Sequence, residues 1–249
     1  TDGQGYIYMM KEGRGRSDAG GNFLMSKQVD NWYFELNSLI EDGTTLFADG
    51  DNVQTDGRTY HGRKMENDKN VVYLRPVVNW KPTSELSFSA AMESIVVNNA
   101  YGYTNSKGEF VDQSDRTGYG LTMTWDNTKT DPDNGVIFNL NTAYLDANNE
   151  DDFTAATNIW WKNFEVGYIY AHNKISDFNG VVCDNDCIIQ EEGTYDIHTV
   201  HASYWIKNVM NMQNFNIYLG TYYSKIQSDE KISSDDDRYG ARVRFKYYF

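Results

Sequence analysis

Apolar and polar residues alternate along most of this 249-residue chain, in segments that recur about every twenty residues. Because side chains of a strand point to opposite faces with a period of two, such segments predict strands with one apolar face. A helical period of comparable length is not found. We expect twelve strands, at residues 4–14, 20–28, 31–41, 69–81, 85–98, 116–128, 134–147, 152–162, 164–176, 194–207, 214–227 and 237–249.

The expected strands have nearly the length that a tilted strand needs to cross a bilayer, roughly 9–11 residues. Their number is even, as in bacterial single-chain barrels. The sequence therefore predicts an all-β fold, a transmembrane antiparallel up-and-down β-barrel of 12 strands, as one domain over residues 1–249. A soluble, ligand-binding antiparallel barrel remains the alternative.

The connections alternate between short and long segments. With the N-terminus on the periplasmic side, the short ones are periplasmic turns, at Val29–Asp30, Pro82–Ser84, Lys129–Asp133, Asn163 and Asn208–Gln213. The external loops are mostly long and rich in Asp, Asn, Gly and Ser, and include residues 42–68, 99–115, 177–193 and 228–236. Short periplasmic turns with longer outer loops are typical of outer-membrane barrels.

Tryptophan supports the same layout. All six tryptophans fall near the periplasmic end of an expected strand: Trp32, Trp80, Trp125, Trp160, Trp161 and Trp205. Amphipathic rings favour the membrane–water boundary, whereas a soluble core would spread them along the strands.

The expected strand over 237–249 distinguishes the lipid-facing side from the lumen-facing side. Arg or Lys facing lipid at mid-depth costs about 2–4 kcal/mol, so Arg242 and Arg244 are expected to face the lumen, with Arg238 and Lys246. The outward residues are then Tyr239, Ala241, Val243, Phe245, Tyr247 and Phe249.

The same rule places other inward residues. Arg75 and Arg116 are expected on the lumen face of their strands, and Tyr218 and Tyr222 on the lumen face of the strand over 214–227. Acidic residues point inward too, among them Glu93 and Glu35.

The first expected strand is ambiguous. One phase puts Arg14 and Arg16 in the lumen beside the arginines of the last strand, because first and last strands close a barrel. The opposite phase exposes Arg14 near the outer boundary, where a long side chain can reach the interface.

Composition agrees with a barrel. Mean hydropathy is −0.67, because a polar lumen dilutes the apolar residues, while aromatics reach 15%, with 19 Tyr against 3 Pro. No apolar run approaches the ~20 residues of a spanning helix. The net charge of −14 argues against a nucleic-acid partner. Thr1 does not open an apolar stretch, so we expect a mature form whose signal peptide has been removed.

A basic lumen face attracts anions, and the planar guanidinium pairs bidentately with a carboxylate. Tyr and Asn between the cations suit sugar hydroxyls. These features predict passage of an acidic sugar or oligosaccharide through the outer membrane of a Gram-negative cell. Two alternatives stay open: the lumen arginines pair with lumen acids and brace the wall, or the channel passes neutral or mixed small solutes.

The stretch GNFLMSKQVDNWYFELNSLIED and the ending DDRYGARVRFKYYF resemble the second, third and closing strands of the oligogalacturonate-specific porin family, which also holds the sialic-acid channel. The resemblance implies a small monomeric twelve-stranded barrel whose arginine and lysine rows pass acidic sugars. It points at Arg238, Arg242 and Arg244, and further at Arg75, Arg14 and Arg16. The sequence departs from the family in the acidic residues of its loops.

Other classes of function have little support in the sequence. The four histidines are His61, His172, His198 and His201, and no Ser–His–acid grouping stands out. His198 and His201 lie three residues apart and face opposite sides of a strand, so no metal site is expected. We expect no enzyme and no cofactor. A surface loop that acts as an adhesin is a third class, but the loops carry no aromatic cluster.

The two cysteines, Cys183 and Cys187, lie in the polar stretch CDNDC. Two thiolates cannot assemble a zinc framework. A short loop disulfide in an oxidising compartment is the prediction, and two free exposed thiols are the alternative.

Overall fold

The computed structural model of the protein describes most of the chain in separate stretches. These are residues 20–41, 59–60, 63–64, 66–67, 71–97, 101–104, 107–112, 115–148, 150–175, 193–228 and 236–247. The first expected strand, 4–14, lies outside the described residues, as do Arg14, Arg16, His61, Cys183 and Cys187.

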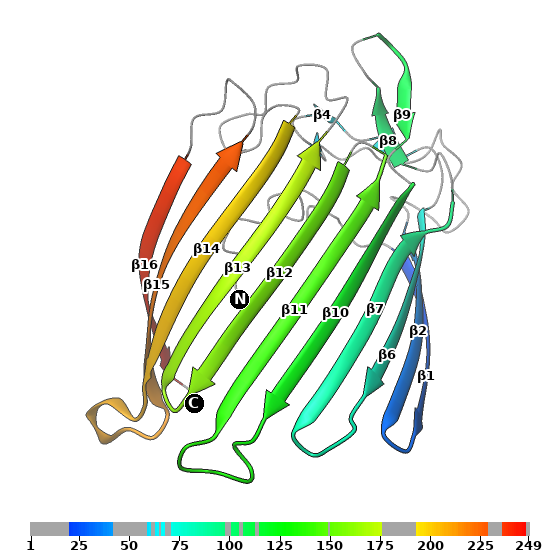
Figure 1. The fold of residues 1–249 in the computed structure, drawn as a ribbon. Coiled ribbons are helices and arrows are strands. Elements are labelled where there is room, and N and C mark those ends of the chain that lie inside the picture. Colours follow the sequence, from blue (N-terminus) through cyan, green and yellow to red (C-terminus); the bar gives the residue numbers. More distant parts are fainter. Residues whose placement is uncertain are drawn as a thin grey trace.

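One curved antiparallel sheet of eleven strands forms the described wall, and each strand pairs with the next long strand along the chain (Figure 1). This arrangement confirms the all-β, up-and-down architecture. The strands are β1 (Gly20–Val29), β2 (Trp32–Glu41), β6 (Val71–Trp80), β7 (Leu86–Ile95), β10 (Arg116–Asp126), β11 (Val136–Ala147), β12 (Glu150–Trp161), β13 (Phe164–Ile175), β14 (Gly193–Ile206), β15 (Phe215–Ser228) and β16 (Asp236–Tyr247).

The expected loops 42–68 and 99–115 are not wholly irregular, and this corrects the sequence analysis. They contain the short strands β3 (Thr59–Tyr60), β4 (Arg63–Lys64), β5 (Glu66–Asn67), β8 (Tyr101–Thr104) and β9 (Phe110–Asp112). β3 pairs with β4, and β5, β8 and β9 form a three-stranded sheet that joins the two loops. Segments of two to four residues are too short for alternation to be recognised.

The connections sort by end as predicted, so we call one end of the sheet the turn end and the other the loop end. The turn-end connections are residues 30–31, 81–85, 127–135, 162–163 and 207–214, the last with a 3₁₀ turn at Val209–Asn211. In the turn over 127–135 a Cβ on Gly135 would collide with the backbone of Asp131 and Thr128, so the close approach requires glycine there. Within the described residues, no helix has the length and apolar character needed to cross a membrane.

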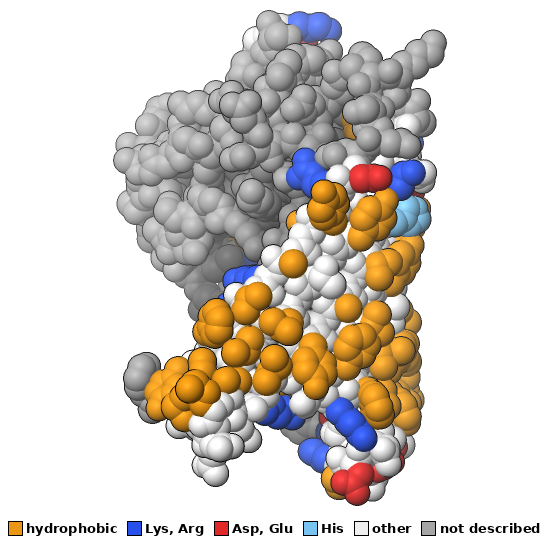
Figure 2. Space-filling model, turned by 90° about the vertical axis from the view of Figure 1, so that its left-hand side faces the viewer, with side chains coloured by type: hydrophobic (Ala, Val, Ile, Leu, Met, Phe, Trp, Pro, Cys, Tyr) orange, Lys and Arg blue, Asp and Glu red, His pale blue; other side chains and the backbone are white. Residues whose placement is uncertain are grey.

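The outer face of the sheet is apolar and exposed. On β16, Tyr239 is 82% exposed, Phe245 66% and Val243 55%, and these residues alternate with the basic ones. Hydrophobic side chains cover this face between charged groups at its two ends (Figure 2). Large exposed apolar side chains in a continuous band are what a lipid-facing surface requires.

All six tryptophans lie toward the turn end, as predicted, but they do not all face outward. Trp32 stacks on Trp80 across β2 and β6, with ring centroids 5.4 Å apart, on the outer face. The register places Trp160 and Trp205 on the inner face, with Glu165 and Tyr218 as their respective partners. The interface preference of tryptophan explains its depth but not the face that it occupies.

Buried side chains of the described residues lie on the inner face of the wall. Most are in the half toward the loop end, while Glu165 and Asn216 lie toward the turn end. The buried set is Tyr73, Ile95, Glu150, Asp152, Glu165, Ala171, Asn173, Tyr195, Ile197, Thr199, Asn216, Ser224 and Ile226. More than half are polar or charged, as expected of a wall that encloses an aqueous interior rather than an oily core.

Candidate functional site

Every predicted lumen cation that the structure describes lies on the inner face. Residues directly opposite each other in a ladder share a face, so the register fixes each position. Arg75 lies opposite Asn37, and Arg116 lies opposite Ala147. The basic residues of β16 lie opposite inner residues of β15. Glu93 and Glu35, also expected inside, face the interior.

Arg75 on β6 pairs with Glu93 on β7. Arg75 Nε lies 2.5 Å from Glu93 Oε2, and the guanidinium carbon lies 5.3 Å from the centre of the Tyr73 ring. The β6–β7 ladder is interrupted at Arg75 and Pro76, because proline has no N–H to donate. The two side chains are 34% and 45% exposed, so the pair faces water.

Arg116 on β10 reaches across β11 to Glu150 on β12, with 3.1 Å between Nη2 and Oε2. The Glu150 side chain is fully buried and that of Arg116 is 19% exposed. Beside them Asn173 Nδ2 donates to Asp152 Oδ1 at 2.5 Å. This corner of the inner wall is a buried polar cluster near the loop end.

The β16 row is the set of inner-face cations Arg238, Arg242, Arg244 and Lys246. They lie opposite Ser224, Gly220, Tyr218 and Asn216 of β15, respectively. Arg242, Arg244 and Lys246 are exposed. The described inner-face residues of β14 and β15 are hydroxyl, amide, aromatic, imidazole and aliphatic groups or glycine, and none is a carboxylate.

Aromatic side chains lie beside the β16 row. Tyr218 stacks on Trp205 with ring centroids 5.5 Å apart, and Trp205 Nε1 donates to Asn216 Oδ1 at 3.2 Å. Tyr222 leans over Gly240, where an added Cβ would come within 2.6 Å of the tyrosine ring. The predicted inner positions of Tyr218 and Tyr222 are therefore those that the structure has.

The sequence analysis missed Glu165, a buried carboxylate on the inner face of β13. Its two oxygens accept hydrogen bonds from Asn158 Nδ2 at 2.7 Å and from Ser203 Oγ at 2.8 Å. Alternation along β13 could have placed Glu165 inside. Its fixed orientation depends on residues from β12 and β14, which only the sheet register brings together.

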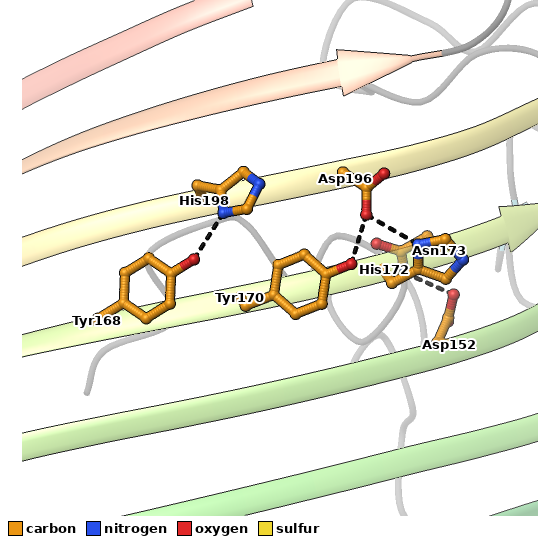
Figure 3. A network of polar contacts seen from close by, with 7 residues as sticks. All are labelled: Asp152, Tyr168, Tyr170, His172, Asn173, Asp196 and His198. Atoms are coloured by element: carbon orange, nitrogen blue, oxygen red, sulfur yellow. Dashed lines mark hydrogen bonds and ion pairs between the residues drawn. The ribbon is translucent and has the colours of Figure 1, made fainter.

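A second missed group lies on the outer face toward the loop end, on β13 and β14 (Figure 3). Asp196 Oδ1 accepts a hydrogen bond from Tyr170 Oη at 2.6 Å and lies 2.8 Å from His172 Nδ1. Tyr168 Oη lies 2.6 Å from His198 Nδ1. His198 and His201 face opposite sides of β14, as predicted, and the structure places His198 on the outer face and His201 on the inner face. No group of three or more potential metal ligands is present among the described residues.

An apolar outer face, an inner face of charged, amide and aromatic groups, and short turns opposite connections that are mostly longer define an outer-membrane β-barrel channel. The whole chain, residues 1–249, matches the sequence model of the family described as porin-like glycoporin RafY, and the chain belongs to that family. It is a channel of the Gram-negative outer membrane, and the family supports a channel rather than an enzyme. The narrower resemblance to oligogalacturonate-specific porins stays a prediction.

The other comparisons add no argument about the fold or the function. No curated protein matches the sequence significantly. A similar solved structure is OmpTdeltaL8, the loop L8 deletion mutant of OmpT, an outer membrane protein of Vibrio cholerae. The two chains are 13% identical with a TM-score of 0.47, and the alignment covers 92% of this chain and 62% of that one.

Proposed function

We propose that the channel passes acidic sugars and oligosaccharides, and that the β16 row guides their carboxylates. The observation that carries this proposal is the row itself: Arg238, Arg242, Arg244 and Lys246 share one inner face. A row of like charge along the direction of passage offers a carboxylate successive contacts, and a guanidinium can bind it bidentately. Tyr218 and Tyr222 beside the row offer hydroxyls and ring faces to the sugar.

A channel for neutral sugars is the second candidate, and a specific observation favours it. Arg75 and Arg116, which were expected to guide substrate, are each within ion-pair distance of a glutamate. Ion pairing of this kind braces a wall and cancels its field, so these two arginines give little support to an anion preference. The family description, a glycoporin, is compatible with either substrate class.

The test is the reversal potential of the channel in a planar bilayer under a salt gradient. We expect anion preference in the wild type and its loss in the double variant Arg242→Ala with Arg244→Ala. Swelling of liposomes in digalacturonate against a neutral disaccharide of similar size then tests the substrate class. Cation preference of the wild-type channel, or equal entry of the two sugars, would overturn the proposal.

A further inference from the structure

Gly220 lies on the inner face of β15 at a position that no neighbouring atom covers, which we call the Gly220 recess, with Gly220 as its floor. A Cβ built on Gly220 meets nothing within 4 Å, although its neighbours across the ladder are Ser203 on β14 and Arg242 on β16. In contrast, a Cβ on Gly167 or Gly240 would strike a side chain that covers the glycine. Neighbouring atoms thus leave the Gly220 position uncovered, whereas side chains cover the other two glycines.

The side chains next above this position, toward the loop end, lean apart. His201 and Tyr222 lie directly opposite each other on β14 and β15. The His201 ring extends over Gly167 on β13, whereas the Tyr222 ring extends over Gly240 on β16. The two rings therefore diverge from adjacent strands, and each lies over a glycine on the far side from the other.

We propose that this Gly220 recess is a subsite for one hexuronate residue, an inference that rests on the proposed function. The recess is bounded by Arg242 on one side, Ser203 on the other, and Tyr218 toward the turn end. A sugar acid needs a cation for its carboxylate, acceptors and donors for its hydroxyls, and an apolar edge for its ring, and these three kinds of group surround the floor.

Ser203 is held in place for this role. Its hydroxyl donates to Glu165 Oε2 at 2.8 Å, so its lone pairs face other donors, such as sugar hydroxyls. Glu165 is itself buried and fixed by Asn158. The tyrosine below the floor is fixed as well, since Tyr218 stacks on Trp205. A site whose groups are already oriented loses little entropy when a ligand enters.

The floor residue allows a direct experiment, because Gly220→Val adds bulk in the recess while the charged and aromatic residues around it stay unchanged in sequence. A β-branched residue suits a strand, and open space above Gly220 accepts it, so the barrel is expected to fold. Gly120→Val is the matched control: Gly120 lies on the inner face of β10 between Ala91 and Ala143, and an added Cβ there makes ordinary contact at 4.0 Å. Folding of both variants is checked by the heat-dependent mobility of the barrel in gels.

The measured quantity is the concentration of digalacturonate that half-blocks the ion current through single channels. We expect Gly220→Val to raise this concentration by roughly tenfold or more, the loss of one charge-assisted hydrogen bond or its equivalent, and Gly120→Val to leave it unchanged. Gly220→Ala is the fallback should the larger side chain prevent folding, with an increase in the same direction.

Two negative results have different meanings. If the wild-type channel prefers anions and is blocked by digalacturonate but Gly220→Val is blocked equally well, the recess is not a subsite and the proposed function stands. If the wild-type channel is not blocked by digalacturonate and does not prefer anions, the proposed function fails and takes the subsite with it.

Discussion

Two sets of arginines lie on the same inner face and differ in what stands across from them. Arg75 and Arg116, on the β6–β12 side, each have a glutamate within 3.1 Å. The β16 row faces inner residues of β15 and β14 that include no carboxylate within the described stretches. Cations on one face thus have different neighbours: carboxylates on nearby strands for Arg75 and Arg116, and hydroxyl, amide and aromatic groups of β15 for the β16 row.

The largest expected effect is on stability at the buried pair. Glu150→Gln removes the carboxylate that pairs with Arg116, and breaking a buried pair lowers the free energy of unfolding by about 3 kcal/mol. The variant is expected to unfold at lower urea concentration than the wild type.

Glu93→Gln is the matched control, because its pair with Arg75 is more than one third exposed and a surface pair contributes at most about 1 kcal/mol. Equal losses of unfolding free energy in the two variants would show that burial does not separate the pairs.

The next prediction concerns salt. If the β16 row supplies the anion preference, raising the ionic strength from 0.1 M to 1 M shortens the Debye length from about 10 Å to about 3 Å and removes most of that preference. The anion preference at each ionic strength is measured by the reversal potential under a fixed salt gradient.

Salt screens the buried Arg116–Glu150 pair much less, so its contribution to the free energy of unfolding is expected to change little between 0.1 M and 1 M ionic strength. An anion preference that persists at 1 M would mean that a narrow bound contact, and not the field of the row, selects the ion.

The exposed Arg75–Glu93 pair allows the net charge of the lumen wall to be changed by one substitution. Glu93→Gln removes the partner of Arg75 and adds one net positive charge to the wall. A unit charge about 10 Å from an ion in water contributes roughly 0.4 kcal/mol, which favours an anion and disfavours a cation by roughly twofold each, so the anion-to-cation permeability ratio changes by roughly fourfold.

Glu93→Gln is therefore expected to raise the anion preference, whereas the double variant Arg75→Gln with Glu93→Gln returns it to the wild-type value because the net charge is restored. A ratio that stays constant in both variants would place this pair outside the ion pathway.

Alternation predicted the eleven long strands of the described wall and the inner positions of Arg242, Tyr218 and Tyr222, because the cost of a cation in lipid acts on each strand alone. It could not predict the partner of a lumen arginine. Arg116 and Glu150 are 34 residues apart and on strands that are not neighbours, so their contact depends on register and side-chain length. The Gly220 recess was hidden for the same reason, since an opening is a property of side chains that lean away on other strands.

The smallest expected effect compares one glycine from each wall. Gly240→Ala on β16 places a Cβ within 2.6 Å of the Tyr222 ring, so the ring must turn away. Gly120→Ala on β10 meets only ordinary contacts and replaces glycine in a strand, where its flexibility is unfavourable by about 0.5–1 kcal/mol. We expect Gly120→Ala to raise the unfolding free energy slightly and Gly240→Ala to lower it or leave it unchanged.

Because the β16 row and Tyr222 share this face, Gly240→Ala is also expected to weaken the digalacturonate block by less than Gly220→Val does. An equal increase in the free energy of unfolding of both variants would show that the Tyr222 ring does not contact Gly240. The evidence that the His201 and Tyr222 rings diverge would then rest on His201 alone.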